Sequence, residues 1–305
     1  MAQRIRGVLS PVVTPFQKDG TVNLEKFVNQ CQWLQANDVG LAFLGTNSEA
    51  NSLSLDERLD MMDALLEAGV SPAAMMPGTG ACDLPTAVRL SQKAARAGCA
   101  GVLTLPPFYY KGVSDEGLFC YFSELIERTG EDSLRVYLYH IPPVAQVGIS
   151  LDLVGRLLDR YPGQIAGIKD SSGDWNNTLA LLTRFKDRDF DVFPGSEVFL
   201  LEALRHGGAG CISATANVNP AAIHRVFASW QSDEAQDLQD SLDRIRGIFQ
   251  SYPMIPALKT AISHWSGDPE WARVRPPLVE LTEAQQGSLI NELKSAGFSM
   301  SDLNS

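Results

Sequence analysis

The chain has 305 residues, of which 45 % are hydrophobic and 20 % charged, and its formal net charge is −11. This length allows one large domain or two ordinary ones, each with an extensive core. An acidic chain without a lysine- or arginine-rich stripe is unsuited to nucleic acid or to an anionic membrane surface, so we expect neither as a partner. The five cysteines lack CxxC spacing, and no signal peptide or membrane-spanning run is apparent, which predicts a reduced, cytoplasmic protein.

Short apolar runs separated by helical patterns recur along the chain. Their hydrophobicity is continuous, which is typical of parallel strands covered on both faces. The alternation predicts the α/β class, and eight such runs predict a closed (β/α)8 barrel of the TIM type. An open doubly wound sheet is the alternative, but "VVTPFQKDG" after the first run lacks the glycine-rich turn of that fold. The expected strands are 7–14, 40–45, 73–78, 100–106, 135–140, 165–170, 191–195 and 210–215. The expected helices between them include 24–38, 54–69, 83–98, 114–130 and 150–162.

The last third of the chain has a different pattern. After residue 220 only helical runs are evident, among them "DLQDSLDRIRGIFQ" and "AQQGSLINELKSAG". We therefore predict a catalytic barrel domain over residues 1–230 and a C-terminal helical extension over residues 231–305.

The run 165–170 ends on Lys169, although burying an ammonium group is costly. The active site of a (β/α)8 barrel lies where the strands end, so Lys169 is a candidate catalytic residue. A lysine in an apolar, desolvated pocket loses part of its preference for the charged form, and its neutral amine can form a Schiff base with a ketone. The alternative is a lysine that pairs with Asp170 or extends toward solvent.

Two further strand ends carry suitable groups. Tyr139 ends the preceding strand, and its phenol could transfer the protons that Schiff-base formation requires, although an ordinary aromatic at the barrel mouth is the simpler reading. The turn "GTNSEA" offers Thr46, Asn47 and backbone N–H groups that could hold a carboxylate. Four histidines show no metal-binding spacing and no G-x-S-x-G occurs, which disfavours a metal-dependent aldolase and a serine hydrolase.

Six motifs occur in one order along the chain. They are "VVTPF" (12–16), "GTNSE" (45–49), "PPFYYKG" (106–112), "YHIP" (139–142), "GIKDSSGD" (167–174) and "CISATANV" (211–218). Together they resemble the dihydrodipicolinate synthase / N-acetylneuraminate lyase family of class I aldolases. The similarity runs from about residue 5 to beyond "RPPLVELT" at 275–282.

The resemblance implies a barrel that assembles as a homotetramer and needs no cofactor beyond its lysine. Lys169 would form the Schiff base with pyruvate or another 2-oxo acid, and Tyr139 would shuttle protons. Thr46 and Asn47 would bind the carboxylate, and Tyr109 would reach across a subunit interface to complete a Tyr–Thr–Tyr relay. The resemblance also implies that the pyruvate pocket is lined by Ile212 and that the variable half of the substrate faces Ser171, Glu197 and Ser213.

The sequence departs from the family pattern at two places. Ser48 replaces the second glycine of the usual G-[ST]-[TN]-G-E turn. Dihydrodipicolinate synthases resemble Y-N-x-P-x-R-x-G, with an arginine that holds the distal carboxylate of the substrate, whereas this chain has no arginine between Tyr139 and Arg156. Asn47 and "FYYKG" are closer to the 4-hydroxy-2-oxoglutarate aldolase branch. We therefore predict a lyase that cleaves 4-hydroxy-2-oxoglutarate or a 2-oxo-3-deoxy sugar acid to pyruvate and an aldehyde.

Other functions stay open at this point. The same lysine would serve a dihydrodipicolinate synthase or a 2-oxo-3-deoxy sugar acid dehydratase. A phosphate-binding barrel isomerase is disfavoured because Glu197, in the turn after the seventh strand, would repel phosphate. A catalytically silent ligand-binding relative is disfavoured because Lys169, Tyr139, Thr46 and Tyr109 are all present.

Overall fold

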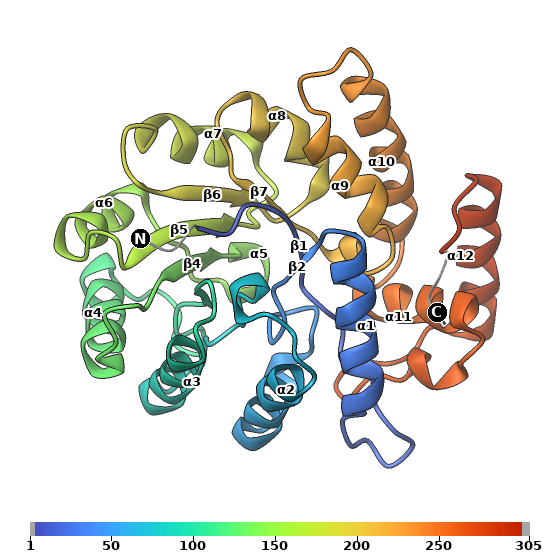
Figure 1. Cartoon of the computed structure of the whole chain (residues 1–305), viewed down its shortest axis with the longest axis horizontal. Helices are drawn as coiled ribbons and strands as arrows, with labels where there is room; N and C mark the ends of the chain where they lie inside the picture. The colour runs from blue at the N-terminus through green and yellow to red at the C-terminus, as the bar shows by residue number, and fades with distance from the viewer. Residues whose placement is uncertain (1–3, 301–305) are drawn as a thin grey trace.

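The computed structural model describes residues 4–300, and within them seven short parallel strands lie inside a ring of helices (Figure 1). The strands form two ladders, β2-β1-β7 and β3-β4-β5-β6. Their bounds are β1 (Gly7–Ser10), β2 (Gly40–Leu41), β3 (Val102–Thr104), β4 (Val136–His140), β5 (Ile165–Asp170), β6 (Asp191–Pro194) and β7 (Gly210–Ile212).

The segment expected as a strand at 73–78 joins the two ladders. It makes one parallel bridge to β2, Leu41 to Met75, and another to β3, Gly78 to Leu103. On the side of β3, Pro77 has no N–H to donate, which interrupts the ladder there. On the other side, the N–H of Ala209, which directly precedes β7, donates to the carbonyl of Val192 in β6 at 3.0 Å. Eight β segments therefore close the barrel, as predicted.

Several strands are shorter than predicted because the chain turns early at the C-terminal mouth. β1 ends at Ser10, directly before Pro11. β7 ends at Ile212, and a 3-10 turn follows at Ala214–Asn217. The Asn217 side chain accepts from the Val13 N–H at 2.9 Å and donates to the Pro11 carbonyl at 3.1 Å, so side-chain bonds replace the ladder there.

Local capping chemistry sets the helix boundaries. Ser54 and Glu57 form a capping box at the start of α2, and Asp83 caps α3 by accepting from the Thr86 N–H. Gly98 and Gly130 end their helices with φ of 82° and 66°, a left-handed conformation that glycine adopts readily. The helices around the barrel are α1 (Leu24–Ala36), α2 (Leu55–Glu67), α3 (Leu84–Ala97), α4 (Asp115–Thr129), α5 (Pro142–Ala145), α6 (Leu151–Arg160), α7 (Trp175–Arg184), α8 (Leu200–Arg205) and α9 (Pro220–Ala228).

Tyr137 fills the interior of the barrel beneath the mouth. It is fully buried, and the flanking strands make room for its ring with glycines. A Cβ at Gly101 would lie 2.6 Å from the ring, and one at Gly167 would lie 2.7 Å from it. The interior is therefore packed solid, which confines any cavity to the ends of the strands.

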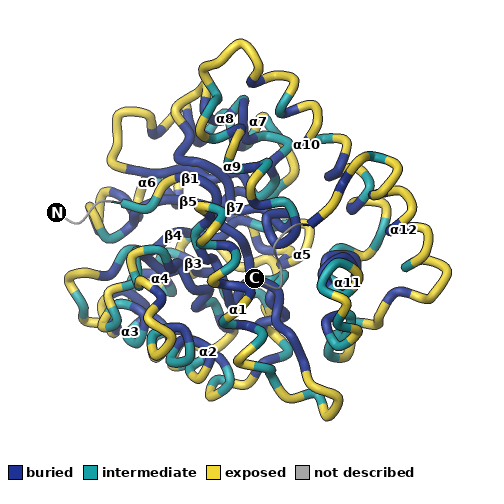
Figure 2. Tube along the Cα trace, turned by 45° about the vertical axis from the view of Figure 1, so that its right-hand side comes forward, coloured by how far each residue is buried: buried dark blue, intermediate teal, exposed yellow. Residues whose placement is uncertain are grey.

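The C-terminal helices α10 (Ala235–Gln250), α11 (Met254–Ser266) and α12 (Glu283–Ser295) pack against one side of the barrel (Figure 1). They share a hydrophobic cluster with barrel residues, in which Val13 and Val218 join Phe249 and Leu258. Figure 2 shows the buried strands at the centre and exposed residues on the outer faces of the helices. The division at residue 230 remains a prediction, and residues 1–3 and 301–305 of the two predicted domains lie outside the described part. None of the helices within residues 4–300 has the length and apolar character needed to cross a membrane.

Candidate active site

Lys169 and Tyr139 lie side by side at the mouth of the barrel. They occupy paired positions on the parallel strands β4 and β5, so both side chains reach the same height. Lys169 is only 2 % exposed, and its Nζ donates to the Tyr139 hydroxyl at 3.3 Å and lies 4.3 Å from the centre of the ring. The register of β4 and β5 thus places the buried Lys169 amine in contact with the Tyr139 hydroxyl.

Asp170 does not pair with Lys169. Its carboxylate accepts from the Ser172 N–H at 3.0 Å, from Asn177 at 3.0 Å and from the Thr178 hydroxyl at 2.6 Å. These donors satisfy the carboxylate within its own loop and helix, so the alternative of a Lys169–Asp170 ion pair is wrong. The amine is left to face the Tyr139 hydroxyl and the cavity.

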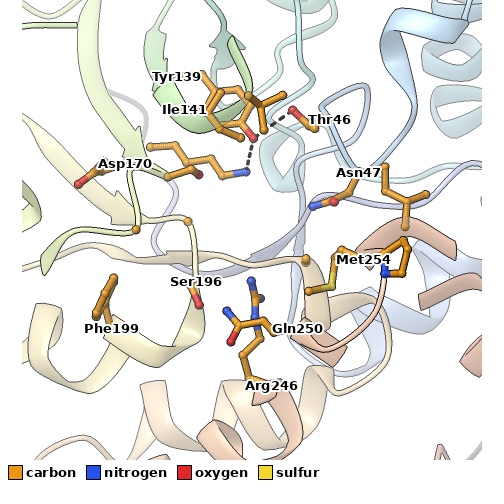
Figure 3. A pocket seen from close by; sticks show the side chains of 18 of the residues that line it. Thr46, Asn47, Tyr139, Ile141, Asp170, Ser196, Phe199, Arg246, Gln250 and Met254 are labelled. Atoms are coloured by element: carbon orange, nitrogen blue, oxygen red, sulfur yellow. Dashed lines mark hydrogen bonds between the residues drawn. The ribbon is translucent and has the colours of Figure 1, made fainter. Parts of the chain in front are cut away.

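Thr46 extends this contact into a chain of three polar groups (Figure 3). Its hydroxyl lies 3.3 Å from the Tyr139 hydroxyl, and either oxygen can donate. The Lys169–Tyr139–Thr46 chain therefore offers a path along which a proton can move to and from the amine.

The turn that carries Thr46 is braced without a second glycine. The left-handed residues near it are Leu44 and Glu49, with φ of 60° and 56°, and Ser48 is not among them. The Ser48 hydroxyl accepts from the Gly45 N–H at 3.3 Å, and its carbonyl accepts from the Thr14 hydroxyl at 2.6 Å. A serine thus fits at position 48, where the family usually has glycine, because the positive φ falls on Glu49 instead.

A fully buried ion pair anchors the far end of this turn. The Glu49 carboxylate accepts from Lys259 at 2.7 Å and from the Arg275 N–H at 2.8 Å. Both Glu49 and Lys259 side chains have no exposed surface. Burial lowers the pKa of Lys259 to about 8, against the opposing charge of Glu49. The C-terminal helices thereby hold the Thr46 turn in place.

A cavity of about 430 Å³ opens between the strand ends and the C-terminal helices. Five of the predicted site residues line it: Thr46, Asn47, Tyr139, Lys169 and Ser171. Ser171 stands against Gly195, where a Cβ would overlap the serine side chain. Within residues 4–300, no group of three or more His, Cys, Asp or Glu side chains is placed to hold a metal ion.

The model of the dihydrodipicolinate synthetase family matches residues 4–296. The chain belongs to this family. The chain is 32 % identical over 287 residues to an uncharacterized DapA-like lyase of Chloroflexus aurantiacus, covering 93 % of this chain and 94 % of the relative. It is 30 % identical to the 4-hydroxy-tetrahydrodipicolinate synthase of Mesorhizobium japonicum, over 96 % of this chain and 99 % of the relative.

Solved structures of the dihydrodipicolinate synthetase family share the whole fold. A dihydrodipicolinate synthase from Agrobacterium tumefaciens matches with a TM-score of 0.88 and 30 % identity, over 96 % of this chain and 99 % of that one. YagE from E. coli K12, solved in complex with pyruvate, matches with a TM-score of 0.87 and 26 % identity, over 97 % and 99 % of the two chains. The predicted family and barrel fold are confirmed, and the chain is an enzyme of the lyase class. Its place nearer the 4-hydroxy-2-oxoglutarate aldolase branch remains a prediction.

Three residues that family resemblance assigned to the substrate pocket, Ile212, Glu197 and Ser213, are not on the cavity wall. Ile212 is fully buried and packs in the barrel interior with Tyr139. Glu197 is 2 % exposed and accepts from the hydroxyls of Ser213 and Thr215, so Glu197 and Ser213 bind each other behind the wall. Their roles toward substrate remain predictions.

Tyr109 lies away from the Lys169–Tyr139–Thr46 chain. Its side chain is 74 % exposed, and its ring meets Tyr110 edge-on at 5.3 Å between centroids. Within one copy of the chain Tyr109 is not brought to the cavity, and its predicted contribution across a subunit interface remains a prediction.

The C-terminal helices supply cavity residues that sequence analysis missed. Arg246 and Gln250 come from α10, Met254 from α11 and Leu278 from the segment before α12. A weak signal was present in the sequence: Gln239 and Arg246, seven residues apart, lie along one edge of the apolar stripe of α10, and both are buried in the structure. Family motifs at the strand ends did not point to this helix.

Proposed function

We propose that the protein is a class I aldolase in which Lys169 forms a Schiff base with pyruvate or a related 2-oxo acid. The observation that carries the proposal is the buried amine of Lys169, in contact with the Tyr139 hydroxyl and beyond it with Thr46. Support also comes from YagE, a structural relative that was solved with pyruvate.

In the cleavage direction, the Lys169 amine attacks the 2-oxo carbon, and the resulting carbinolamine loses water to form an iminium. Tyr139 gives and takes the protons of these steps, with Thr46 holding its hydroxyl. The iminium then accepts the electron pair of the C3–C4 bond, while the proton of the 4-hydroxyl leaves and an aldehyde departs. Protonation of the enamine and hydrolysis by one water release pyruvate and restore the amine. No cofactor takes part in this sequence.

The preferred substrate is a 4-hydroxy-2-oxo acid, either 4-hydroxy-2-oxoglutarate or a 2-oxo-3-deoxy sugar acid. Thr46 and Asn47 on the cavity wall would receive the 2-oxo acid carboxylate. The C-terminal helices enlarge the cavity beyond these groups, which leaves room for an aldehyde half. The homotetramer expected from family resemblance belongs to the same proposal, since the exposed turn of Tyr109 and Tyr110 is free to meet a second copy.

A second candidate is 4-hydroxy-tetrahydrodipicolinate synthesis, the activity in the names of several relatives. The loop after β4 counts against it. This loop folds as the short helix α5, and it lines the cavity with Ile141 and Val144, without an arginine before Arg156. A sugar acid dehydratase remains a third outcome, because it would use the same iminium.

Reductive trapping tests the proposal. Intact-protein mass spectrometry after pyruvate and borohydride treatment is expected to show one adduct, which peptide mapping locates on Lys169. Lys169→Ala is expected to abolish the adduct and turnover, while Lys186→Ala, an exposed control, keeps both. Assays of pyruvate release from 4-hydroxy-2-oxoglutarate and 2-keto-3-deoxygluconate, beside formation of 4-hydroxy-tetrahydrodipicolinate, distinguish the candidate activities. Absence of an adduct in the folded enzyme with several 2-oxo acids would overturn the Schiff-base assignment.

A further inference from the structure

Arg246 enters the cavity from the wall opposite Tyr139 and Thr46 (Figure 3). It lies in the last turns of α10, so it belongs to the C-terminal helices and to none of the barrel strands. The residue is only 9 % exposed. An arginine so far from solvent needs partners for its charge and for its five N–H donors.

One end of the guanidinium is firmly held. Nη1 donates to the Glu197 carboxylate at 3.1 Å and to the Ser213 hydroxyl at 3.2 Å. Glu197 is in turn fixed by the hydroxyls of Ser213 and Thr215. This cluster orients Arg246 and provides its counter-charge, because charge-assisted hydrogen bonds to a buried carboxylate are strong and directional.

The other donors of Arg246 have no partner among residues 4–300. Nε is buried without a hydrogen bond, and Nη2 has none to any described side chain or carbonyl. Nε is enclosed, whereas Nη2 keeps accessible surface, so Nη2 is the donor that an oxygen of a ligand in the cavity would satisfy. Part of the cavity wall is apolar and suits the carbon chain of such a ligand. This part is formed by Phe199, Met254 and Leu278.

We propose that Arg246 determines specificity by donating to an oxygen on the aldehyde half of the substrate. This inference rests on the proposed aldolase function. The oxygen belongs either to a carboxylate, as in glyoxylate, or to a hydroxyl, as in glyceraldehyde, and both are acceptors for the free Nη2 donor. An aldehyde of similar size that lacks this oxygen, such as propanal, leaves the donors unpaired and is a poorer partner.

The test is aldol addition of pyruvate to glyoxylate, glyceraldehyde and propanal. For Arg246→Met, kcat/KM is expected to fall by about 10- to 100-fold with the oxygenated aldehyde that the enzyme prefers, mainly through KM, and by less than about threefold with propanal. A selective loss with glyoxylate identifies the carboxylate as the acceptor, and a selective loss with glyceraldehyde identifies the hydroxyl. Arg244→Met, an exposed position on the same helix, is the matched control.

Two further variants separate recognition from folding. Arg246→Met leaves Glu197 buried without its counter-charge, so the double variant Arg246→Met with Glu197→Gln removes both charges. Arg246→Lys keeps a cation for Glu197 but loses the free Nη2 donor, and it is expected to lose the same preference.

Pyruvate–borohydride trapping is run on every variant. Absence of an adduct in the parent enzyme overturns the proposed function itself. If the adduct forms and the three aldehydes keep their relative kcat/KM values in the Arg246 variants, or all lose equally, Arg246 is structural and the present inference is wrong.

Discussion

At the level of single side chains, Tyr139 shows how the fold brings distant polar groups into contact. The register of β4 and β5 puts its hydroxyl 3.3 Å from the Lys169 amine, and Thr46 approaches from the neighbouring turn at the same distance. Neither neighbour is close to Tyr139 in the sequence. The hydroxyl therefore joins strand β5 to the turn after β2, two segments that only the closed barrel brings together.

Tyr139→Phe is expected to lower kcat by about 10²- to 10³-fold, because the proton transfers of Schiff-base formation and C–C cleavage lose their shuttle. The ring stays in place, so the change in the free energy of unfolding is expected to be small. Steady-state rates and the rate of pyruvate trapping provide the measurement. Tyr252→Phe, which removes a hydroxyl bonded to Glu292 on the outer surface, is the control. A rate within threefold of the parent would exclude Tyr139 as the shuttle.

Among the elements, α11 has an unexpected role. Its Lys259 is buried next to Phe16 and pairs with Glu49, at the end of the turn that carries Thr46. A helix from the C-terminal part of the chain thus fixes a loop of the barrel. A buried pair of this kind is sensitive to loss of one partner, since the other charge is left desolvated.

Lys259→Met is expected to destabilise the protein by about 3–5 kcal/mol, because the buried Glu49 carboxyl would lose its partner. Adding Glu49→Gln removes that carboxyl, keeps an acceptor for the Arg275 N–H, and is expected to restore more than half of the loss. Urea unfolding measures the free energy of unfolding of the single and of the double variant. Lys93→Met breaks a half-exposed pair with Asp63 and is expected to cost less than about 1 kcal/mol. Equal losses of stability for Lys259→Met and Lys93→Met would show that burial does not raise the cost of breaking the Lys259–Glu49 pair.

Across the whole molecule, Arg275 ties the C-terminal segment to the N-terminal part of the barrel. It donates to the Gly20 carbonyl at 2.6 Å, to the Ser52 carbonyl at 2.8 Å and to the Glu57 carboxylate. Its hydrogen bond is the largest cause that lowers the pKa of Glu57 to about 2. The contact between the two ends of the chain is therefore sensitive to acid.

Because the pKa of Glu57 is lower in the folded than in the unfolded protein, its contribution to stability is present above about pH 4.5 and is lost as the pH falls toward 2. Glu57→Gln is expected to be less stable than the parent at pH 6, by up to about 3 kcal/mol, and the gap is expected to narrow at pH 3. Urea unfolding at both pH values measures it. Glu67→Gln, at an exposed position on the same helix, is the control. A gap that does not change with pH would mean that the two carboxyl states bind Arg275 equally well.

Much of the architecture was predictable from local patterns. Continuous apolar runs marked the β segments, and caps such as Ser54 and Asp83 marked helix starts. Because parallel strands bring their carboxyl ends to one edge, strand position was enough to place Lys169 beside Tyr139. The β segment at 73–78 was also found, although its irregular pairing depends on neighbours on both sides.

Other parts of the site follow from packing between distant segments. Glu197 and Arg246 are 49 residues apart and Glu49 and Lys259 are 210 apart, yet each pair is buried. Helical periodicity indicates which face of α10 is buried, but it does not indicate that the barrel mouth lies opposite Arg246. The position of Glu197 behind the cavity wall and the unpaired donors of Arg246 both depend on how α10 packs against the barrel. Local sequence thus determined the barrel and the lysine near the end of β5, whereas the shape and polarity of the distal cavity arose only when the C-terminal helices packed over the strand ends.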